Sequence, residues 1–345
     1  MNSISPAVLL ITPFHIHQRG NTLTTRRICT GLNRQGLTAE LLSMEDPHYR
    51  EKLHQHLGSG KFDIIHAFNG LYLAGLLAIQ PQVLNYPLIV TLTGTDINQP
   101  EMEEDGALEP VLAAARYIIV FHDDFKKLLL GRNPCLEEKL AVIPQGIRLP
   151  AAPVRKPQDF GIPAGSTLFM LPIGLRPVKN VDLALDGLEA LAREDSRVRL
   201  LIIGPVIDKT YGEQVLRRIR NLPWVIYTGE VPHTEISGIY RLGHVVINCS
   251  DAEGQPQAAL EAMSLGVPVI LRDVPGNRGI IRNGQEGFYI QTPEDLYRAA
   301  RILHTRPALR QEMGQAAAEL VAAKFDSAVE IKRHIELYKK ALDKS

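Results

Sequence analysis

Short apolar runs, separated by stretches with a helical pattern, recur along the whole chain. The first set of runs occupies 8–12, 38–42, 62–66, 88–93, 117–121 and 140–143. A second set follows at 167–173, 198–204, 224–228, 244–248, 267–271 and 288–290. Continuous apolar runs of this length are typical of parallel strands that are buried on both faces. The pattern predicts an α/β protein with two Rossmann-like, doubly wound domains.

Proline residues mark the boundary between the two sets of runs. They are Pro144, Pro150, Pro153, Pro157 and Pro163, and such spacing is typical of an interdomain linker. We expect an N-terminal domain over 1–150 and a C-terminal domain over 151–326. Residues 327–345 are predicted to form a helix, which begins with the capping-box pattern Ser327-x-x-Glu330. The pattern leaves open whether this helix packs on the second domain or crosses back to the first.

Charge and cysteine content narrow the classes of function. Lys plus Arg and Asp plus Glu each number 38, so no net field favours a nucleic acid or an anionic membrane. The three cysteines lie far apart without a C-x-x-C pair, which argues against a disulfide framework or structural zinc. No run approaches the roughly 18 apolar residues of a membrane span, and peripheral membrane contact is left open. These features favour a cytoplasmic protein.

Two carboxylates, Glu253 and Glu261, flank a predicted helix start near residue 258. The segment follows the predicted strand 244–248, and Gly266 and Pro268 end the helix. A helix N-terminus attracts phosphate or sugar oxygens, and carboxylates accept hydrogen bonds from hydroxyl groups. The spacing predicts a site for a phosphorylated or hydroxyl-rich ligand, although an acid and nucleophile pair of a glycoside hydrolase remains an alternative.

Two cations follow the first predicted strand of the second set. Arg176 and Lys179 lie in the turn after 167–173, where a nucleotide-binding fold meets phosphate. The forked guanidinium of an arginine can grip a phosphate, and a lysine adds a point charge. Solvated surface charges are the plainer alternative for such a pair.

These motifs resemble the signatures of a known enzyme family. The run Glu253-Gly254-x6-Glu261-Ala262-Met263-x2-Gly266-x-Pro268-Val269 resembles that of the retaining glycosyltransferases of family 4, which have the GT-B fold. Gly174-Leu-Arg-Pro-Val-Lys179 is similar to the family's Gly-Arg-x4-Lys segment, with altered spacing. With Thr93-Gly-Thr-Asp96 and Pro275-Gly-Asn277, these segments look most like the branch named for the glycosyltransferase 1 domain-containing protein 1. They are similar in part to the selenosugar synthase branch.

The resemblance implies transfer of a sugar from a nucleotide diphosphate sugar to an acceptor, with retention of configuration and without a metal or other cofactor. It implies that Arg176 and Lys179 stabilise the leaving group, that Glu253 orients the transferred sugar and that Glu261 holds the ribose hydroxyls. Further donor contacts are expected from Gly20, Asn21, Gly229, Val231, Gly254, Gln255, Gln257 and Ala258. The acceptor, a small molecule, a glycan or a lipid-linked compound, is expected near Thr95, Asp96, His66, His122 and Asn277.

One departure from the family pattern keeps other functions open. Thr93 stands where many relatives have a histidine in the His-Gly-x-Asp turn, and His66 and His122 are the candidate substitutes. The alternatives are a nucleotide-sugar epimerase of the same fold, a selenosugar synthase-like transferase and a non-catalytic nucleotide-sugar-binding module. No nucleic-acid partner is expected. The sequence gives no chemical code for the donor base, the transferred sugar or the acceptor.

Overall fold

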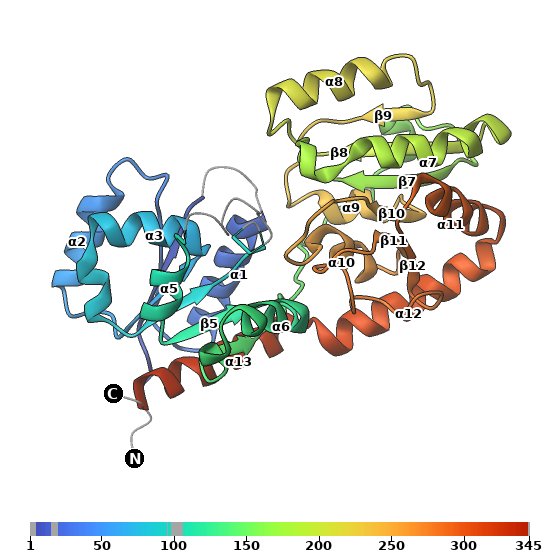
Figure 1. Ribbon diagram of the computed structural model, residues 1–345. Helices are drawn as coiled ribbons and strands as arrows, with labels where there is room; N and C mark the ends of the chain where they lie inside the picture. Colours follow the sequence, from blue (N-terminus) through green and yellow to red (C-terminus); the bar gives the residue numbers. More distant parts are fainter. Residues whose placement is uncertain (1–4, 15–19, 95, 98–105, 344–345) are drawn as a thin grey trace. The chain divides into compact units, whose positions relative to one another are not determined.

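The computed structural model describes residues 5–14, 20–94, 96–97 and 106–343 (Figure 1). The chain divides into two compact units. Unit 1 comprises Met1–Gly146 and Asp326–Ser345, and unit 2 comprises Ile147–Phe325. The C-terminal helix therefore crosses back to the N-terminal domain, which is one of the two arrangements that the sequence left open.

Unit 1 contains a parallel sheet with the strand order β2-β1-β3-β4-β5-β6. Its strands are β1 (Val8–Thr12), β2 (Ala39–Ser43), β3 (Ile64–Phe68), β4 (Leu88–Thr91), β5 (Tyr117–Val120) and β6 (Leu140–Val142). Its helices are α1 (Gly20–Arg34), α2 (Tyr49–Gly58), α3 (Gly70–Ile79), η1 (Pro81–Asn85), α5 (Glu109–Ala114), α6 (Asp123–Arg132), η2 (Pro134–Leu136) and α13 (Ser327–Asp343). The chain passes from β1 to β2 and then returns to the other side of β1. The topological switch point of this sheet therefore lies between β1 and β3.

Unit 2 repeats this plan with the strand order β12-β11-β10-β7-β8-β9. Its strands are β7 (Thr167–Pro172), β8 (Val198–Ile203), β9 (Val225–Tyr227), β10 (Val245–Asn248), β11 (Val269–Arg272) and β12 (Gly287–Ile290). Its helices are η3 (Pro157–Phe160), η4 (Pro177–Lys179), α7 (Val181–Glu194), α8 (Lys209–Ile219), α9 (Ile236–Tyr240), α10 (Gln257–Met263), α11 (Pro293–Thr305) and α12 (Pro307–Lys324). Here the switch point lies between β7 and β10.

The prediction of two Rossmann-like domains is confirmed. Each predicted strand coincides with an observed one, and its ends are shifted by no more than two residues. The inner strands are buried on both faces, as the continuous apolar runs require, because helices cover each sheet on two sides. None of the described helices is long and apolar enough to cross a membrane.

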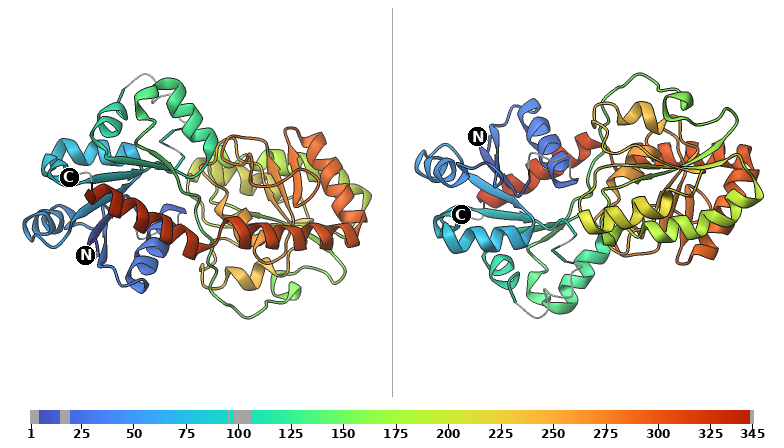
Figure 2. Two further views of the ribbon diagram at one scale, coloured as in Figure 1. Left: turned by 90° about the horizontal axis from the view of Figure 1, so that it is seen from below. Right: turned by 90° about the horizontal axis from the view of Figure 1, so that it is seen from above.

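Helix α13 completes the core of unit 1 (Figure 2). Its Tyr338 is fully buried, and its Glu330 forms two hydrogen bonds of 2.8 and 2.9 Å with the guanidinium of Arg27 on α1. Gly31 of α1 allows close packing, because a Cβ atom there would lie 2.5 Å from the side chain of Ile331. The last helix is therefore an integral part of the N-terminal domain.

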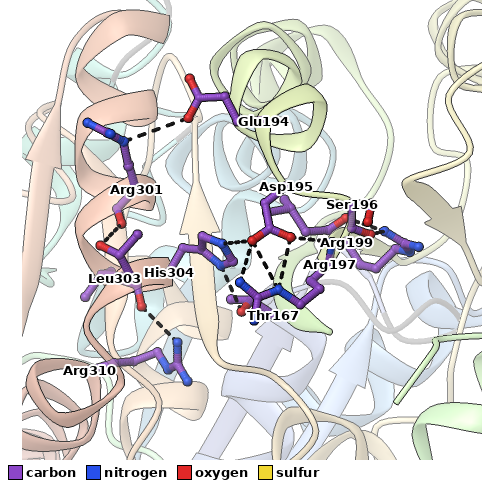
Figure 3. Close-up of polar contacts among 12 residues, drawn as sticks. Thr167, Glu194, Asp195, Ser196, Arg197, Arg199, Arg301, Leu303, His304 and Arg310 are labelled. Atoms are coloured by element: carbon purple, nitrogen blue, oxygen red, sulfur yellow. Dashed lines mark hydrogen bonds and ion pairs between the residues drawn. The ribbon is translucent and has the colours of Figure 1, made fainter. Parts of the chain in front are cut away.

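A polar cluster closes the amino-terminal edge of the sheet in unit 2 (Figure 3). The ring of His304, on α11, lies 3.0 Å from Asp195 Oδ2 and 2.9 Å from the hydroxyl of Thr167, the first residue of β7. Arg197 also bonds to Asp195 at 2.6 Å, and this hydrogen bond is the main reason why the pKa of Asp195 is lowered. The cluster ties α7 to α11 and lies at the edge of the sheet opposite to the predicted ligand site.

Candidate functional site

Lys179 and Glu253 form an ion pair at the switch point of unit 2. Lys179 ends η4, which follows β7, and Glu253 lies in the loop after β10. Lys179 Nζ lies 2.6 Å from Glu253 Oε1, and the two side chains are only 14% and 11% exposed. Because β7 and β10 are neighbours in the sheet, residues 74 positions apart meet at the carboxyl edge, where open α/β sheets bind ligands.

The environment of Glu253 keeps its carboxyl ionised. Burial alone would raise the pKa of Glu253, but the charge of Lys179, its hydrogen bond and that of the Asn248 amide at 2.9 Å outweigh burial, and the net pKa is lowered. An ionised carboxylate accepts hydrogen bonds from hydroxyl groups. It is a poor general acid, because the acid of a glycoside hydrolase needs a raised pKa. The charge state of Glu253 therefore disfavours the glycoside-hydrolase alternative.

Two neighbouring loops hold the Glu253 segment in place. The amide of Asp251 donates a 2.8 Å hydrogen bond to the carbonyl of Val178, and the side chain of Asn180 donates to Asp251 Oδ1 at 3.0 Å. Gly276, in the turn after β11, packs directly on Glu253, because a Cβ atom there would lie 2.0 Å from the carbonyl oxygen of Glu253. The loops after β7, β10 and β11 thus form one packed frame.

Glu261 lies on α10 with an exposed fraction of 4%. Its Oε1 lies 2.9 Å from Nε2 of His233 and 3.5 Å from the amide nitrogen of Gln257, and its Oε2 accepts a 3.4 Å hydrogen bond from the hydroxyl of Tyr240. Burial, followed by the charge of Glu261, raises the pKa of Tyr240 well above its ordinary value. His233, Tyr240 and Asn248 were missed by the sequence analysis, because only the fold brings them to the two carboxylates.

A hollow of about 520 Å³ lies at edge strand β9 and the turn that follows it. Phe160, Ile226 and Val231 give it apolar walls, while Arg155 and Glu230 give it polar ones. The turn contains Gly229 at a left-handed φ of 73° and continues into His233, the partner of Glu261. The hollow therefore adjoins the turn that carries the Glu261 partner.

Most of the remaining predicted donor residues occupy the loops of unit 2 described above. Arg176 is half-buried and directly precedes η4, three positions before Lys179. Gly254 and Gln255 are buried in the loop after Glu253. Gln257 and Ala258 begin α10 and are half-buried, whereas Gly20 and Asn21 begin α1 in unit 1.

Two residues predicted to face the acceptor belong to the interior of unit 1. His66 is fully buried, and its ring nitrogens lie 2.7 Å from the hydroxyls of Tyr338 and Thr91. Burial, followed by the charge of nearby His334, holds the pKa of His66 well below its ordinary value. His66 is thus a core residue of β3 with both ring nitrogens bonded, and its expected contact with the acceptor stays a prediction.

Asp96 is also fully buried and acts as a structural acceptor. It accepts hydrogen bonds from the backbone amides of Gly70, Thr93 and Gly94 at 2.7, 2.8 and 2.9 Å. Burial raises the pKa of Asp96 despite these donors. The carboxylate of Asp96 therefore organises the turn after β4, and its expected contact with the acceptor stays a prediction. Thr95, from the same turn, lies outside the described residues.

Asn277 and His122 have local structural contacts. Asn277 is fully buried, and its amide nitrogen donates to Asn248 Oδ1 at 3.2 Å and to the carbonyl of Arg272 at 2.8 Å. It supports the residue that bonds to Glu253, and its expected place near the acceptor stays a prediction. His122 caps α6 by accepting from the amide of Asp124 at 3.1 Å, and it remains at the carboxyl edge of β5. Across the described ranges, no three His, Cys, Asp or Glu side chains are grouped so as to hold a metal ion.

Known proteins share both the sequence pattern and the fold. The chain is 29% identical over 258 residues to glycosyltransferase 1 domain-containing protein 1 of Xenopus tropicalis, covering 70% of this chain and 72% of that protein. It is 25% identical over 290 residues to D-inositol 3-phosphate glycosyltransferase of Arthrobacter sp. (strain FB24), covering 78% of this chain and 68% of that protein.

Solved structures of GT-B glycosyltransferases show the same architecture. HepE from Anabaena, in complex with UDP and glucose, matches with a TM-score of 0.78 at 17% identity, over 97% of this chain and all of that one. Sucrose-phosphate synthase from Thermosynechococcus elongatus matches with a TM-score of 0.80 at 16% identity, over 98% of this chain and all of that one. The two α/β units thus form a GT-B fold. Residues 155–320 match the family model of glycosyl transferases group 1, so this chain contains a domain of that family.

Proposed function

We propose that the protein is a retaining glycosyltransferase that moves a sugar from a nucleotide diphosphate sugar to an acceptor hydroxyl without a metal ion. The observation that carries the proposal is the buried Lys179–Glu253 pair at the switch point of unit 2. It combines a cation for phosphate with an ionised carboxylate for sugar hydroxyls. The match to glycosyl transferases group 1 over the same unit supports this interpretation.

The leaving group of this reaction is a nucleoside diphosphate, whose negative charge grows in the transition state. Arg176, which directly precedes η4, and Lys179, which ends it, are positioned to stabilise that charge. Cations that are already held in place by the turn can stabilise the developing charge without moving during the reaction. In other enzymes a metal ion stabilises this charge. Arg176 and Lys179 are therefore proposed as catalytic residues.

The nucleoside would lie along the turn after β9. Glu261 would accept hydrogen bonds from the ribose hydroxyls, with His233 and Tyr240 fixing its two oxygens. The hollow beside Val231 offers apolar side chains on which a planar base could lie, together with several polar ones such as Arg155 and Thr228 that could bond to its edge. UDP is our first candidate, because HepE binds it in the same fold.

Retention follows from attack on the face from which the leaving group departs. The bond between the anomeric carbon and the phosphate oxygen breaks, and a bond to the acceptor oxygen forms on the same face. The acceptor hydroxyl gives its proton to the departing phosphate oxygen. Glu253 stays ionised and orients the transferred sugar, so no protein nucleophile is required.

A thermal-shift screen of the full chain with UDP, GDP, ADP and their sugars tests the donor assignment. A ligand at 100 times its Kd should stabilise the protein by about 2.7 kcal/mol. Arg176→Ala should then slow transfer by at least about tenfold, equivalent to 1.4 kcal/mol of transition-state stabilisation. Arg193→Ala is the matched control, because that side chain is 76% exposed on α7.

Each part of the proposal has its own contrary outcome. Failure to bind any nucleotide would remove the donor site, and normal transfer by Arg176→Ala would remove the phosphate role. An inverted product anomer, identified by proton NMR, would contradict retention. Loss of transfer after treatment with a chelator would contradict metal independence. An epimer formed from the donor alone would favour the epimerase alternative.

A further inference from the structure

Two buried asparagine side chains form a chain of hydrogen bonds that ends at Glu253. Asn248, the last residue of β10, is 8% exposed, and Asn277, in the turn after β11, is fully buried. The amide nitrogen of Asn277 donates to Asn248 Oδ1 at 3.2 Å, and the amide nitrogen of Asn248 donates to Glu253 Oε1 at 2.9 Å. The chain therefore brings an N–H group from the interior of unit 2 to a carboxylate of the candidate site.

The orientation of both asparagine amides is fixed by their other partners. Asn248 Oδ1 accepts a 3.2 Å hydrogen bond from the backbone amide of Ser250, a group that can only donate. The nitrogen of the Asn248 side chain must therefore face Glu253. Asn277 donates a second hydrogen bond, of 2.8 Å, to the carbonyl of Arg272, a group that can only accept. Neither amide can turn over without placing like groups against each other.

This arrangement is unfavourable for packing alone. Among the residues that the structure describes, the buried Oδ1 atom of Asn277 has no hydrogen-bond partner. A buried polar atom without a partner destabilises a fold, and an apolar side chain of the same shape, such as leucine, would avoid that cost. The nitrogen of the same side chain nevertheless holds Asn248 in place. The asparagine pair is therefore better explained by its effect on Glu253 than by packing.

The two donors to Glu253 Oε1 differ in how easily they can leave it. Lys179 Nζ lies 2.6 Å from this oxygen, at the end of a flexible four-carbon stem. In the proposed reaction the same ammonium group is needed by the diphosphate, which carries more negative charge than one carboxylate. Asn248, in contrast, ends a buried strand, and both the oxygen and the nitrogen of its amide are bonded. Donor binding can therefore draw Lys179 away from Glu253, but not Asn248.

We propose that Asn248, held by Asn277, is a positioning residue that keeps Glu253 oriented toward the transferred sugar while Lys179 is engaged by the diphosphate. The inference rests on the proposed glycosyltransferase function and adds to it a residue that the sequence pattern did not indicate. The Lys179–Glu253 pair is then the resting state of the site. The hydrogen bond from Asn248 is the contact of Glu253 that lasts through donor binding.

Calorimetric titration of the full chain at pH 6, 7 and 8 tests this role without an acceptor. The probes are UDP, GDP and ADP, each compared with UDP-glucose, UDP-N-acetylglucosamine, GDP-mannose or ADP-glucose of the same base. The ratio of the Kd for the nucleotide to the Kd for its sugar measures the contribution of the sugar, which Glu253 should orient.

Asn248→Leu keeps the shape of the side chain but removes its amide. The ratio should fall about tenfold at pH 7, as for one lost hydrogen bond to a charged group. The Kd for the nucleotide alone should change by less than about threefold, because the nucleotide lacks the transferred sugar. Asn221→Leu is the matched control, because Asn221 is an exposed asparagine of the same unit.

The pH dependence separates positioning from a general loss of structure. Burial favours the neutral form of Glu253, and the charge of Lys179 opposes it, whereas Asp251 of the same loop pairs with Arg272. In the donor complex of Asn248→Leu the pKa of Glu253 should rise, so the ratio should fall further from pH 8 to pH 6. In Asn248→Asp the new carboxyl keeps the acceptor oxygen, and a proton shared with Glu253 can replace the amide N–H. Its ratio should be lowest at pH 8 and recover toward pH 6.

The outcomes separate this inference from the proposed function. Opposite pH trends in Asn248→Leu and Asn248→Asp, with unchanged affinity for the nucleotide, support the positioning role. Wild-type ratios in both variants refute it and leave the proposed function standing. A loss that is equal at every pH and extends to the nucleotide alone also overturns it. If Asn248→Leu does not fold, a ratio in Asn248→Asp that fails to rise toward pH 6 decides against the role. A wild type that gains nothing from any sugar removes the role of Glu253 and this inference with it, and one that binds no nucleotide refutes both proposals.

Discussion

Replacing Lys179 with methionine removes one charge from the best-defined pair of the candidate site. Methionine keeps the length and the apolar stem of the side chain but removes the ammonium group. Glu253 then loses its 2.6 Å partner and keeps the 2.9 Å hydrogen bond from Asn248. The variant leaves a carboxylate that is 11% exposed without its cation.

The expected cost follows from the burial of this pair. Breaking a buried ion pair by removing one partner costs about 3–5 kcal/mol. The cost should be lower here, because neither side chain is completely buried and Asn248 still donates a hydrogen bond to Glu253. We therefore expect the free energy of unfolding to fall by about 2–3 kcal/mol at pH 7. Without Lys179, burial would raise the pKa of Glu253. The deficit should therefore shrink as pH falls and the carboxyl becomes protonated.

The single tryptophan of the chain gives a local assay. Trp224 is 8% exposed in the core of unit 2, so its fluorescence during urea unfolding reports on the unit that contains the pair. Lys209→Met, at an exposed position at the start of α8, controls for loss of a lysine. Glu253→Gln completes a double-mutant cycle with Lys179→Met, and the cycle should give a coupling of at least about 1 kcal/mol.

Two results would refute this reasoning. One is a Lys179→Met protein whose unfolding free energy stays within about 0.5 kcal/mol of the wild type, the range of ordinary surface substitutions. The other is additivity of Lys179→Met and Glu253→Gln, which would mean that the two charges do not interact. Nucleotide-sugar turnover provides a separate readout, because loss of transfer with intact stability would assign Lys179 to the ligand alone.

Further predictions concern the frame and the core. Glu261→Ala should weaken nucleotide binding at least about tenfold, or 1.4 kcal/mol, in thermal-shift titrations; unchanged affinity would contradict the ribose assignment. Gly276→Ala should destabilise unit 2 by about 1–3 kcal/mol through overpacking on Glu253, whereas Gly131→Ala, with open space around it, should not. Burial lowers the pKa of His334 to about 4. In the unfolded chain His334 binds a proton near pH 6.5, whereas in the folded chain it does so only near pH 4. The free energy of unfolding should therefore fall by about 3 kcal/mol from pH 6.5 to 4. Circular dichroism during urea unfolding measures the free energy of unfolding at each pH. If that free energy falls as steeply with pH in His334→Phe as in the wild type, the prediction is wrong.

The strands and the positions of the loops that carry the candidate site could be predicted from the sequence because their signals are local. Apolar runs report burial on two faces, and the Glu253 and Lys179 motifs lie directly after strands at the edge that binds ligands. Two partners of Glu261 could not be predicted in this way. His233 and Tyr240 reach Glu261 from other segments of unit 2, and no local pattern marks a residue that is a neighbour only in space.

The structural contacts of two polar residues in unit 1 could not be predicted from the sequence either. Asp96 and His66 are polar residues close to strand ends, which is also where ligand-binding residues lie. Whether such a side chain points outward or into the core depends on its partners, here the amide of Gly70 and the hydroxyl of Tyr338. Tyr338 is 272 positions from His66. The sequence therefore indicates chemistry at the edge of the sheet but not the direction of each side chain.

The crossing of α13 has a consequence for biosynthesis. Unit 1 begins the chain but takes its last helix from residues that follow all of unit 2. A ribosome adds roughly 5–20 residues per second, so the first sheet waits on the order of 10–40 seconds for Ile331 and Tyr338. Until α13 is made, the surface of α1 around Gly31 has no contact with Ile331, and the ring of His66 has no hydrogen bond with Tyr338. During synthesis unit 2 can fold first, although its sequence comes second.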